Sequence, residues 1–231
     1  MTVLVLASQL NEMAQRAVAG WPGQRAILLT PSDLSIEGWY VCHHDFEQST
    51  LVATGKLFPV DKISGVVTLM PFVAEYELFS IEPPNRRYAA AEMMAFLFYV
   101  LTSLRCPVVN TPTAYNLTGP NWRYEEWLRA CREVGLPVKP YHRLPVGESL
   151  MPQNMYRTKT VSVLGNRVIV RDFDVSSAAV KQLAAAANVQ FLEVRFTEEN
   201  GQNSVSSVNC IPDLSDPVVF DALYDHFKNA T

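Results

Sequence analysis

The chain of 231 residues lacks the sequence signatures of several common enzyme classes. It contains no glycine-rich phosphate loop, no G-x-S-x-G segment and no H-E-x-x-H segment, which argues against P-loop enzymes, α/β-hydrolases and zinc proteases. It also lacks a basic excess, because 19 Lys and Arg against 23 Asp and Glu give a net charge of −4. We therefore expect no general attraction to nucleic acid or to an anionic membrane.

Cysteine pairs and metal-ligand spacings are missing as well. The four cysteines, Cys42, Cys106, Cys131 and Cys210, never form a C-x-x-C pair, so we expect buried free thiols instead of a zinc site or a disulfide framework. His43 and His44 lie next to each other, but adjacent residues on a strand point to opposite faces. We therefore expect no metal site at this histidine pair.

A membrane or secretion segment is not evident either. The N-terminus reads MTVLVLASQLNEM, with no basic region and an apolar run too short for a signal peptide or a membrane span. The longest apolar helix, predicted over residues 89–104, contains Glu92 and reads as a buried core helix. We predict a cytoplasmic protein with no membrane partner.

What is present is a core-forming composition, 48% hydrophobic and 18% charged, which suits one large domain or two small ones. The first half reads as an α/β unit with a mostly parallel, Rossmann-like sheet, since a buried strand, an amphipathic helix and a second buried strand open it. The predicted elements are strands at 2–7, 26–30, 65–70 and 107–109, a hairpin at 51–58 around Thr54-Gly55, a helical segment at 73–79, and a long helix from about Tyr88.

The middle of the chain supplies a connecting helix and a linker. Residues 122–134 are amphipathic, and Gly135 provides the C-terminal stop. Trp122 and Trp127 are five residues apart and do not share one helical face, so we expect one in the core and one partly exposed. Residues 145–156 show no periodicity and form the best linker candidate.

The last part reads as an antiparallel α+β module. A hairpin at 159–172 turns at Gly165-Asn166, because glycine and asparagine tolerate the positive φ of tight turns. A helix opened by Asp174 or Ser176, two strands at 189–197 and 204–211, and a closing helix at 216–230 with Pro217 in its first turn complete it. We predict an N-terminal domain at 1–144 and a C-terminal module at 157–231.

The strand-to-helix crossing at 106–127, CPVVNTPTAYNLTGPNWRYEEW, holds the chain's most distinctive polar side chains. Loops at the carboxyl ends of strands in open α/β sheets are where such folds bind ligands. One interpretation is a small-molecule or peptide site between the two modules, and the other is a turn bonded to itself through Asn and Thr side chains. The candidate ligand-binding residues are Asn110, Thr111, Thr113, Asn116, Gly119 and Trp122.

Two arginines precede the long helix. Arg86 and Arg87 together with backbone N–H groups offer an anion site. The alternative is that they cover the surface or pair with Glu82 and Glu92. We keep both arginines as ligand-binding candidates.

These segments resemble ATP-grasp carboxylate-amine ligases of the glutamate-ligase branch. The first match is PVVNTPTAYNLTGP followed by a helix and GLPVKPYHRL, and it resembles the N-terminal, pre-ATP-grasp part of these enzymes. The second is the C-terminal module, in which Ser207-Val208-Asn209 with Pro212 behind it is similar to the acidic-Val-Asn triplet that ends the fold. The resemblance covers most of the chain and implies an ATP-grasp-like architecture.

The departures from that family point away from its chemistry. Fewer than twenty residues with one glycine, Gly147, stand where the resemblance places the nucleotide-binding subdomain. The acidic position of the triplet is Ser207, and only Glu193 and Asn209 stay as weak metal candidates, whereas phosphoryl transfer depends on charge neutralisation by metal ions. The resemblance therefore implies a shortened relative that lacks the nucleotide-binding subdomain, with no cofactor expected and Mg-ATP as the alternative.

Two functional hypotheses follow. The first is a non-catalytic binding or assembly partner, for example of a complete ligase in a biosynthetic pathway. The alternative is a ligase or transferase that acts on an amino acid or peptide carboxylate through the crossing loop, the two arginines, Glu193 and Asn209. The sequence leaves the question of enzyme activity open and leans towards none.

A missing subdomain would also leave the C-terminal sheet uncovered. Its valines, isoleucine and phenylalanines, in residues 160–170 and 191–196, would then need another surface, with Trp122 or Trp127 as an anchor. We therefore predict a homodimer, or a heterodimer with a ligase, that buries at least about 1,000 Å².

Overall fold

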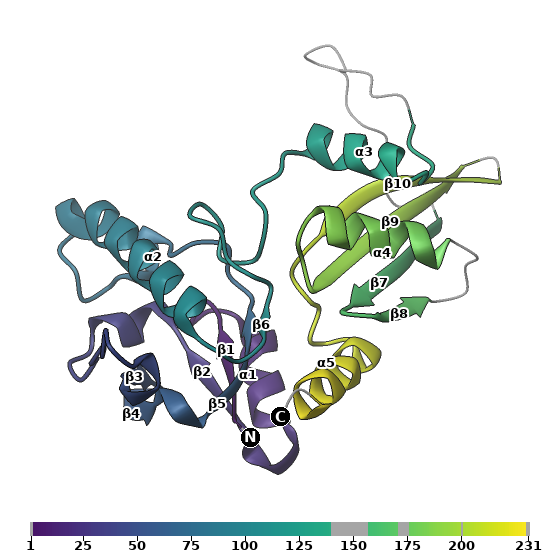
Figure 1. The fold of residues 1–231 in the computed structure, drawn as a ribbon. Coiled ribbons are helices and arrows are strands. Elements are labelled where there is room, and N and C mark those ends of the chain that lie inside the picture. The colour runs from purple at the N-terminus through teal and green to yellow at the C-terminus, as the bar shows by residue number, and fades with distance from the viewer. Residues whose placement is uncertain (1, 140–156, 171–175, 200, 230–231) are drawn as a thin grey trace.

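Two four-stranded β-sheets organise the chain (Figure 1). The computed structural model describes residues 2–139, 157–170, 176–199 and 201–229. The first sheet is parallel, with the order β2 (Ala26–Leu29), β1 (Thr2–Leu6), β5 (Ile63–Thr68) and β6 (Val108–Val109). The second is antiparallel, with the order β10 (Gln202–Asn209), β9 (Phe191–Glu199), β7 (Arg157–Leu164) and β8 (Arg167–Val170). The predicted combination of a parallel and an antiparallel sheet is confirmed.

The parallel sheet is apolar on both faces, which explains why its strands read as continuous hydrophobic runs. Val3 and Val5 of β1 belong to one core cluster, and Leu4 and Leu6 belong to another on the opposite face. The first face packs against α1 (Glu12–Ala19) and α5 (Pro217–Asn229), and the second packs against α2 (Arg86–Ser103). The hairpin of β3 (Thr50–Ala53) and β4 (Lys56–Pro59) turns at Thr54-Gly55 as predicted, with φ of 52° and 69°.

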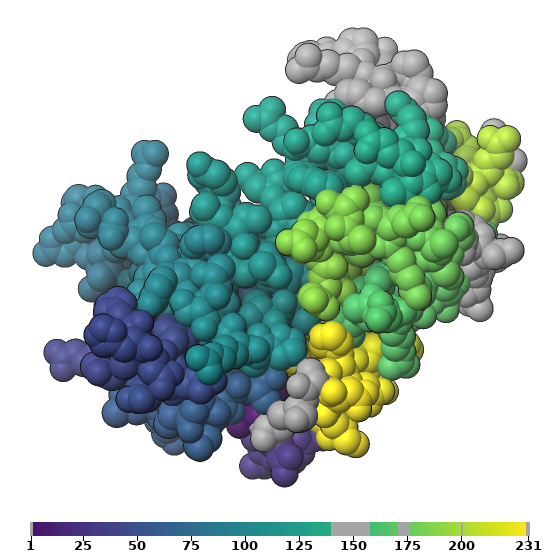
Figure 2. Space-filling model, in the orientation of Figure 1, coloured from purple at the N-terminus to yellow at the C-terminus, as the bar shows by residue number. Residues whose placement is uncertain are grey.

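Helix α5 joins the two halves of the chain. It comes from the C-terminal module but packs on the N-terminal sheet, where the buried ring of Phe227 fills the space above Gly65. A Cβ at Gly65 would collide with this ring, so the absence of a side chain permits the close approach. Figure 2 shows α5, in yellow, directly below the green C-terminal module.

The antiparallel sheet is covered by helices of its own chain. The helices α3 (Tyr124–Glu133) and α4 (Ser177–Ala186) lie on one face, and Ser176 caps α4 by accepting a bond from the Ala179 N–H. Val170 on β8 is 41% exposed and Val168 is half-buried, and the dimer stays a prediction. The other strand residues that we expected to need a partner surface are at most 7% exposed. They are Val161, Val163, Ile169, Phe191, Val194 and Phe196.

Packing therefore does not follow chain order. Helix α3 lies against the second sheet and α5 against the first, so the core elements cross the predicted boundary between 144 and 157. That division stays a prediction. The linker at 145–156 lies outside the described residues.

Two local predictions need correction. Residues 73–79 contain only a short 3₁₀ turn at Glu75–Glu77, because the Glu77 side chain is directed to the loop after β1. The long helix starts at Arg86, so both arginines belong to its first turn. The prediction that one tryptophan lies in the core and the other is partly exposed is confirmed, since Trp127 is buried and Trp122, which precedes α3, is half-buried. Their rings lie 4.7 Å apart.

No helix within the described part of the chain is long and apolar enough to cross a membrane.

Candidate functional site

The loop after β6 begins with Asn110, which is 0% exposed and joins the two sheets. Its Oδ1 accepts a hydrogen bond from the Phe191 N–H at 2.6 Å, and its Nδ2 donates to the carbonyl groups of Phe191 and Cys210, both at 2.8 Å. Strand β10 pairs with β9 up to Glu193, two residues after Phe191. The Asn110 amide therefore gives the main chain of Phe191 the donor and acceptor that a neighbouring strand would otherwise supply.

The next residues of the loop bond to one another. Asn116 Oδ1 accepts from both the N–H and the hydroxyl of Thr118 at 2.8 Å, and the Thr113 hydroxyl donates to the Gly119 carbonyl at 3.2 Å. Gly119 has a φ of 128°, which favours glycine. These contacts are those of the self-bonded turn that we considered as the alternative to a ligand site, and the exposed Thr111 takes no part in them.

The two arginines take different directions. Arg86 donates from Nε to the Ile81 carbonyl at 2.9 Å, and so supports the loop before α2. Arg87 is exposed, and it lines a pocket of about 440 Å³ with Phe72 and Tyr76. None of the described loop residues between 110 and 120 lines this pocket. The structure therefore does not bring the arginines and the crossing loop into one crevice.

The two metal candidates from the sequence are neighbours across strands. Glu193 on β9 lies opposite Asn209 on β10, and Arg195 lies opposite Ser207 on the same face. Arg195 reaches back to the Glu193 carboxylate at 3.2 Å, while the Asn209 amide both donates to and accepts from the backbone of Ile211. This cross-strand group places a guanidinium next to its single carboxylate.

The cross-strand group does not fit the Mg²⁺ that ATP-grasp chemistry requires. Mg²⁺ needs near-octahedral oxygen coordination and is usually held by one or two carboxylates. Here the only carboxylate has a cationic partner, and the amide already bonds within its own turn. In residues 2–139, 157–170, 176–199 and 201–229, no group of three or more His, Cys, Asp or Glu side chains can hold a metal ion.

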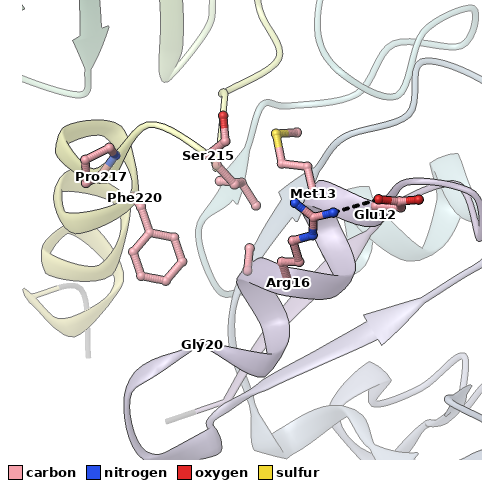
Figure 3. Close-up of a pocket in the computed structure, with 9 residues that line it drawn as sticks. Glu12, Met13, Arg16, Gly20, Ser215, Pro217 and Phe220 are labelled. Carbon is pink, nitrogen blue, oxygen red and sulfur yellow. Dashed lines mark hydrogen bonds and ion pairs between the residues drawn. The ribbon is translucent and has the colours of Figure 1, made fainter.

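A larger pocket of about 600 Å³ lies between α1 and α5 (Figure 3). Met13 extends from α1 and Phe220 from α5 into the gap between the two helices. The charged residues at its rim, Glu12 and Arg16, are paired with each other at 2.8 Å. This pocket is therefore mainly apolar, because the charges of Glu12 and Arg16 at its rim neutralise each other.

Sequence reasoning missed the buried carboxylate of Glu77, which is 3% exposed. It accepts hydrogen bonds from the Ser8 hydroxyl at 2.8 Å and from the Gln9 N–H at 3.1 Å. It thus ties the segment after β5 to the loop after β1, at the carboxyl edge of the parallel sheet. The only available signal was its position a few residues after a buried strand.

Comparisons with known proteins place the fold. No family model and no curated protein matches the chain. The macrocyclase MdnC from Microcystis aeruginosa MRC, bound with the precursor peptide MdnA, is similar with a TM-score of 0.69 and 11% identity, over 99% of this chain and 100% of that one. The ATP-grasp ligase PsnB, complexed with a minimal precursor, Mg and ADP, gives 0.66 and 13%, over 99% and 97%. The D-alanine-D-alanine ligase from Helicobacter pylori gives 0.52 and 10%, over 100% and 96%.

At these identities the similarity establishes the fold and nothing finer. The chain has the mixed α/β fold of ATP-grasp ligases, which confirms that part of the resemblance seen in the sequence. The glutamate-ligase branch, the loss of the nucleotide-binding subdomain and the absence of a cofactor stay predictions.

Proposed function

We propose that this chain is a non-catalytic ATP-grasp-like protein that binds a peptide and serves as an assembly partner of a complete ligase. The comparisons support the ATP-grasp-like fold in this proposal, and the peptide complexes of MdnC and PsnB are the reason for naming a peptide as the ligand. The partner ligase follows from the same reasoning, since a protein that keeps such a scaffold without the chemistry needs an active enzyme to work with.

The observation that carries the proposal is the contact between Arg195 and Glu193 at 3.2 Å. The Glu193 side chain is only 12% exposed, so its charge needs a partner, and the guanidinium supplies it where the resemblance would place a cation. Ser207 opposite Arg195 adds no charge to this group. A site arranged in this way has no need of a divalent ion.

Calorimetry with Mg-ATP tests the proposal directly. We expect no heat of binding up to about 1 mM, a concentration that detects complexes of about 4 kcal/mol. A complete ATP-grasp ligase titrated under the same conditions is the positive control. Micromolar binding that disappears in Glu193→Ala would instead support the alternative, a ligase or transferase acting on an amino acid or peptide carboxylate.

A double substitution tests the physical reason. Ser207→Glu combined with Arg195→Ser replaces the guanidinium by a second carboxylate beside Glu193, so we expect Mn²⁺ binding, measured by electron paramagnetic resonance, to appear in this variant. Ser207→Glu alone, with Arg195 kept, is the matched control and should bind more weakly. Tight Mn²⁺ binding by the wild-type protein would contradict the proposal.

A further inference from the structure

We propose that the pocket of Phe72, Tyr76 and Arg87 binds a peptide segment in which an acidic side chain stands next to an aromatic one. This inference rests on the proposed function and adds to it the place of binding and the class of peptide. It differs from the crossing loop, whose polar groups are largely bonded within the protein.

The pocket occupies the edge of the parallel sheet where ligands bind in open α/β folds. Phe72 follows β5 closely, and the Pro71 carbonyl accepts a bond from the Leu117 N–H at 2.8 Å, which fixes the segment to the loop after β6. Glu77 anchors the other end of the segment to the loop after β1. The pocket wall is therefore held at both ends and is formed in advance of binding.

The walls expose aromatic rings that the fold does not use. Phe72 is 57% exposed and Tyr76 is 63% exposed, whereas Val73, Ala74 and Ala90 form a buried apolar floor. Aromatic rings lose little conformational freedom on binding, and they are enriched at interfaces. A volume of about 440 Å³ accommodates one large side chain and its neighbour.

Charge decides the class of occupant. Arg87 has no hydrogen bond or ion pair with any residue in the described part of the chain, so its guanidinium is free to take a carboxylate through two parallel bonds. Glu75 lines the same pocket and disfavours a polyanion. The combination suits a segment with one acidic group, an adjacent aromatic ring and backbone N–H groups that can donate hydrogen bonds to the Glu75 carboxylate.

The pocket between α1 and α5 is the weaker candidate. Its rim charges, Glu12 and Arg16, already neutralise each other, so nothing there selects one ligand chemistry over another.

Nuclear magnetic resonance with a defined peptide tests the proposal. The probe is acetyl-Gly-Glu-Phe-Gly-amide, titrated to about 5 mM into the full chain, with the Gln and the Ala analogues at the Glu and Phe positions as matched peptides. We expect shift changes at the backbone amides of residues 72–76 and 87–90. Each analogue should bind about fivefold more weakly than the parent peptide.

Variants of the protein locate the site. Arg87→Gln and Phe72→Ala change exposed side chains, so both proteins should fold, and each should weaken the peptide by about five- to twentyfold. Arg132→Gln makes the same change of charge on an exposed residue of α3 and should leave the affinity unchanged.

The outcomes separate this inference from the proposed function. Peptide binding that is unaffected by Arg87→Gln, shift changes confined to other residues, or no binding at all would overturn the pocket assignment. Mg-ATP binding in calorimetry would overturn the non-catalytic assignment, and it would leave the result of the peptide titration as it is.

Discussion

Replacing Asn110 with alanine should destabilise the protein more than any other single change in the crossing loop. The side chain is 0% exposed, and its amide bonds the main chain of Phe191 twice and the carbonyl of Cys210 once, across 81 and 100 residues of sequence. Alanine removes one acceptor and the donor group at once. The Phe191 N–H and the carbonyl groups of Phe191 and Cys210, with the more distant Thr118 carbonyl at 3.3 Å, would then lose this partner.

The magnitude follows from the number of groups left unpaired. A buried polar group without a partner costs about 1–3 kcal/mol, and relaxation of the loop will recover part of the sum. We expect a loss of about 3–5 kcal/mol in the free energy of unfolding, a large share of the roughly 5–15 kcal/mol of a typical domain. For a chain of this size, that loss lowers Tm by about 6–20 °C.

Urea denaturation followed by tryptophan fluorescence and by circular dichroism measures the loss. Asn121→Ala, an exposed asparagine in the same crossing, is the matched control and should change stability by less than about 0.5 kcal/mol. Asn110→Asp keeps the volume and the acceptor but removes the donors, and should cost nearly as much as alanine. A loss for Asn110→Ala no larger than that of the control would refute this account of the loop.

Three further predictions concern packing and ionisation. Gly65→Ala should cost about 2–3 kcal/mol in a thermal or urea melt, since the added methyl group meets the buried ring of Phe227, and an unchanged melt would show that α5 does not dock as described. Burial lowers the pKa of His226 from its ordinary value of 6.5, so the unfolded state binds the proton first. The contribution of neutral His226 to stability is full above pH 6.5 and is lost as the pH falls below that value. The variant His226→Gln should therefore have a melting temperature that depends less on pH between 7 and 5. Equal slopes of melting temperature against pH in the wild type and the variant would contradict this. Burial raises the pKa of the Cys131 thiol to about 11, so iodoacetamide at pH 8 should modify the half-buried Cys42 well before Cys131 in the native protein, as mass spectrometry can show.

The elements that sequence predicted well are those set by local pattern. The run of Val3 to Leu6 is apolar at every position, which indicated a strand buried on both faces, and the two faces indeed belong to different core clusters. The turn at Gly165-Asn166 was predictable because these residue types tolerate positive φ, and Gly165 indeed has a φ of 55°. In these cases the information lies within a few residues of the feature.

The elements that sequence did not predict depend on contacts between distant segments. Nothing near Asn110 indicates that its amide will meet Phe191, and nothing near Glu77 indicates that it will hold Ser8. For the same reason the packing of α5 on the first sheet, through Gly65, could not be seen in the chain order. The cover that α3 and α4 give to one face of the antiparallel sheet could not be seen in the chain order either, and the dimer stays a prediction.

The candidate site also shows this difference between local pattern and long-range contacts. Sequence combined Arg87, as part of an anion site before the long helix, with the crossing loop, as the segment after a buried strand, in one candidate site. In the structure the side chain of Asn110, the buried residue of the loop, makes hydrogen bonds that join the two sheets. Arg87 is exposed and has no hydrogen bond or ion pair with any of the described residues. Asn110 cannot bind a ligand without breaking bonds that join the two sheets. Arg87 lines a pocket with the exposed rings of Phe72 and Tyr76 and can bind a ligand without breaking such a bond. The density of polar side chains in the loop therefore points to structure, and the recognition of a partner is better sought at the pocket beside it.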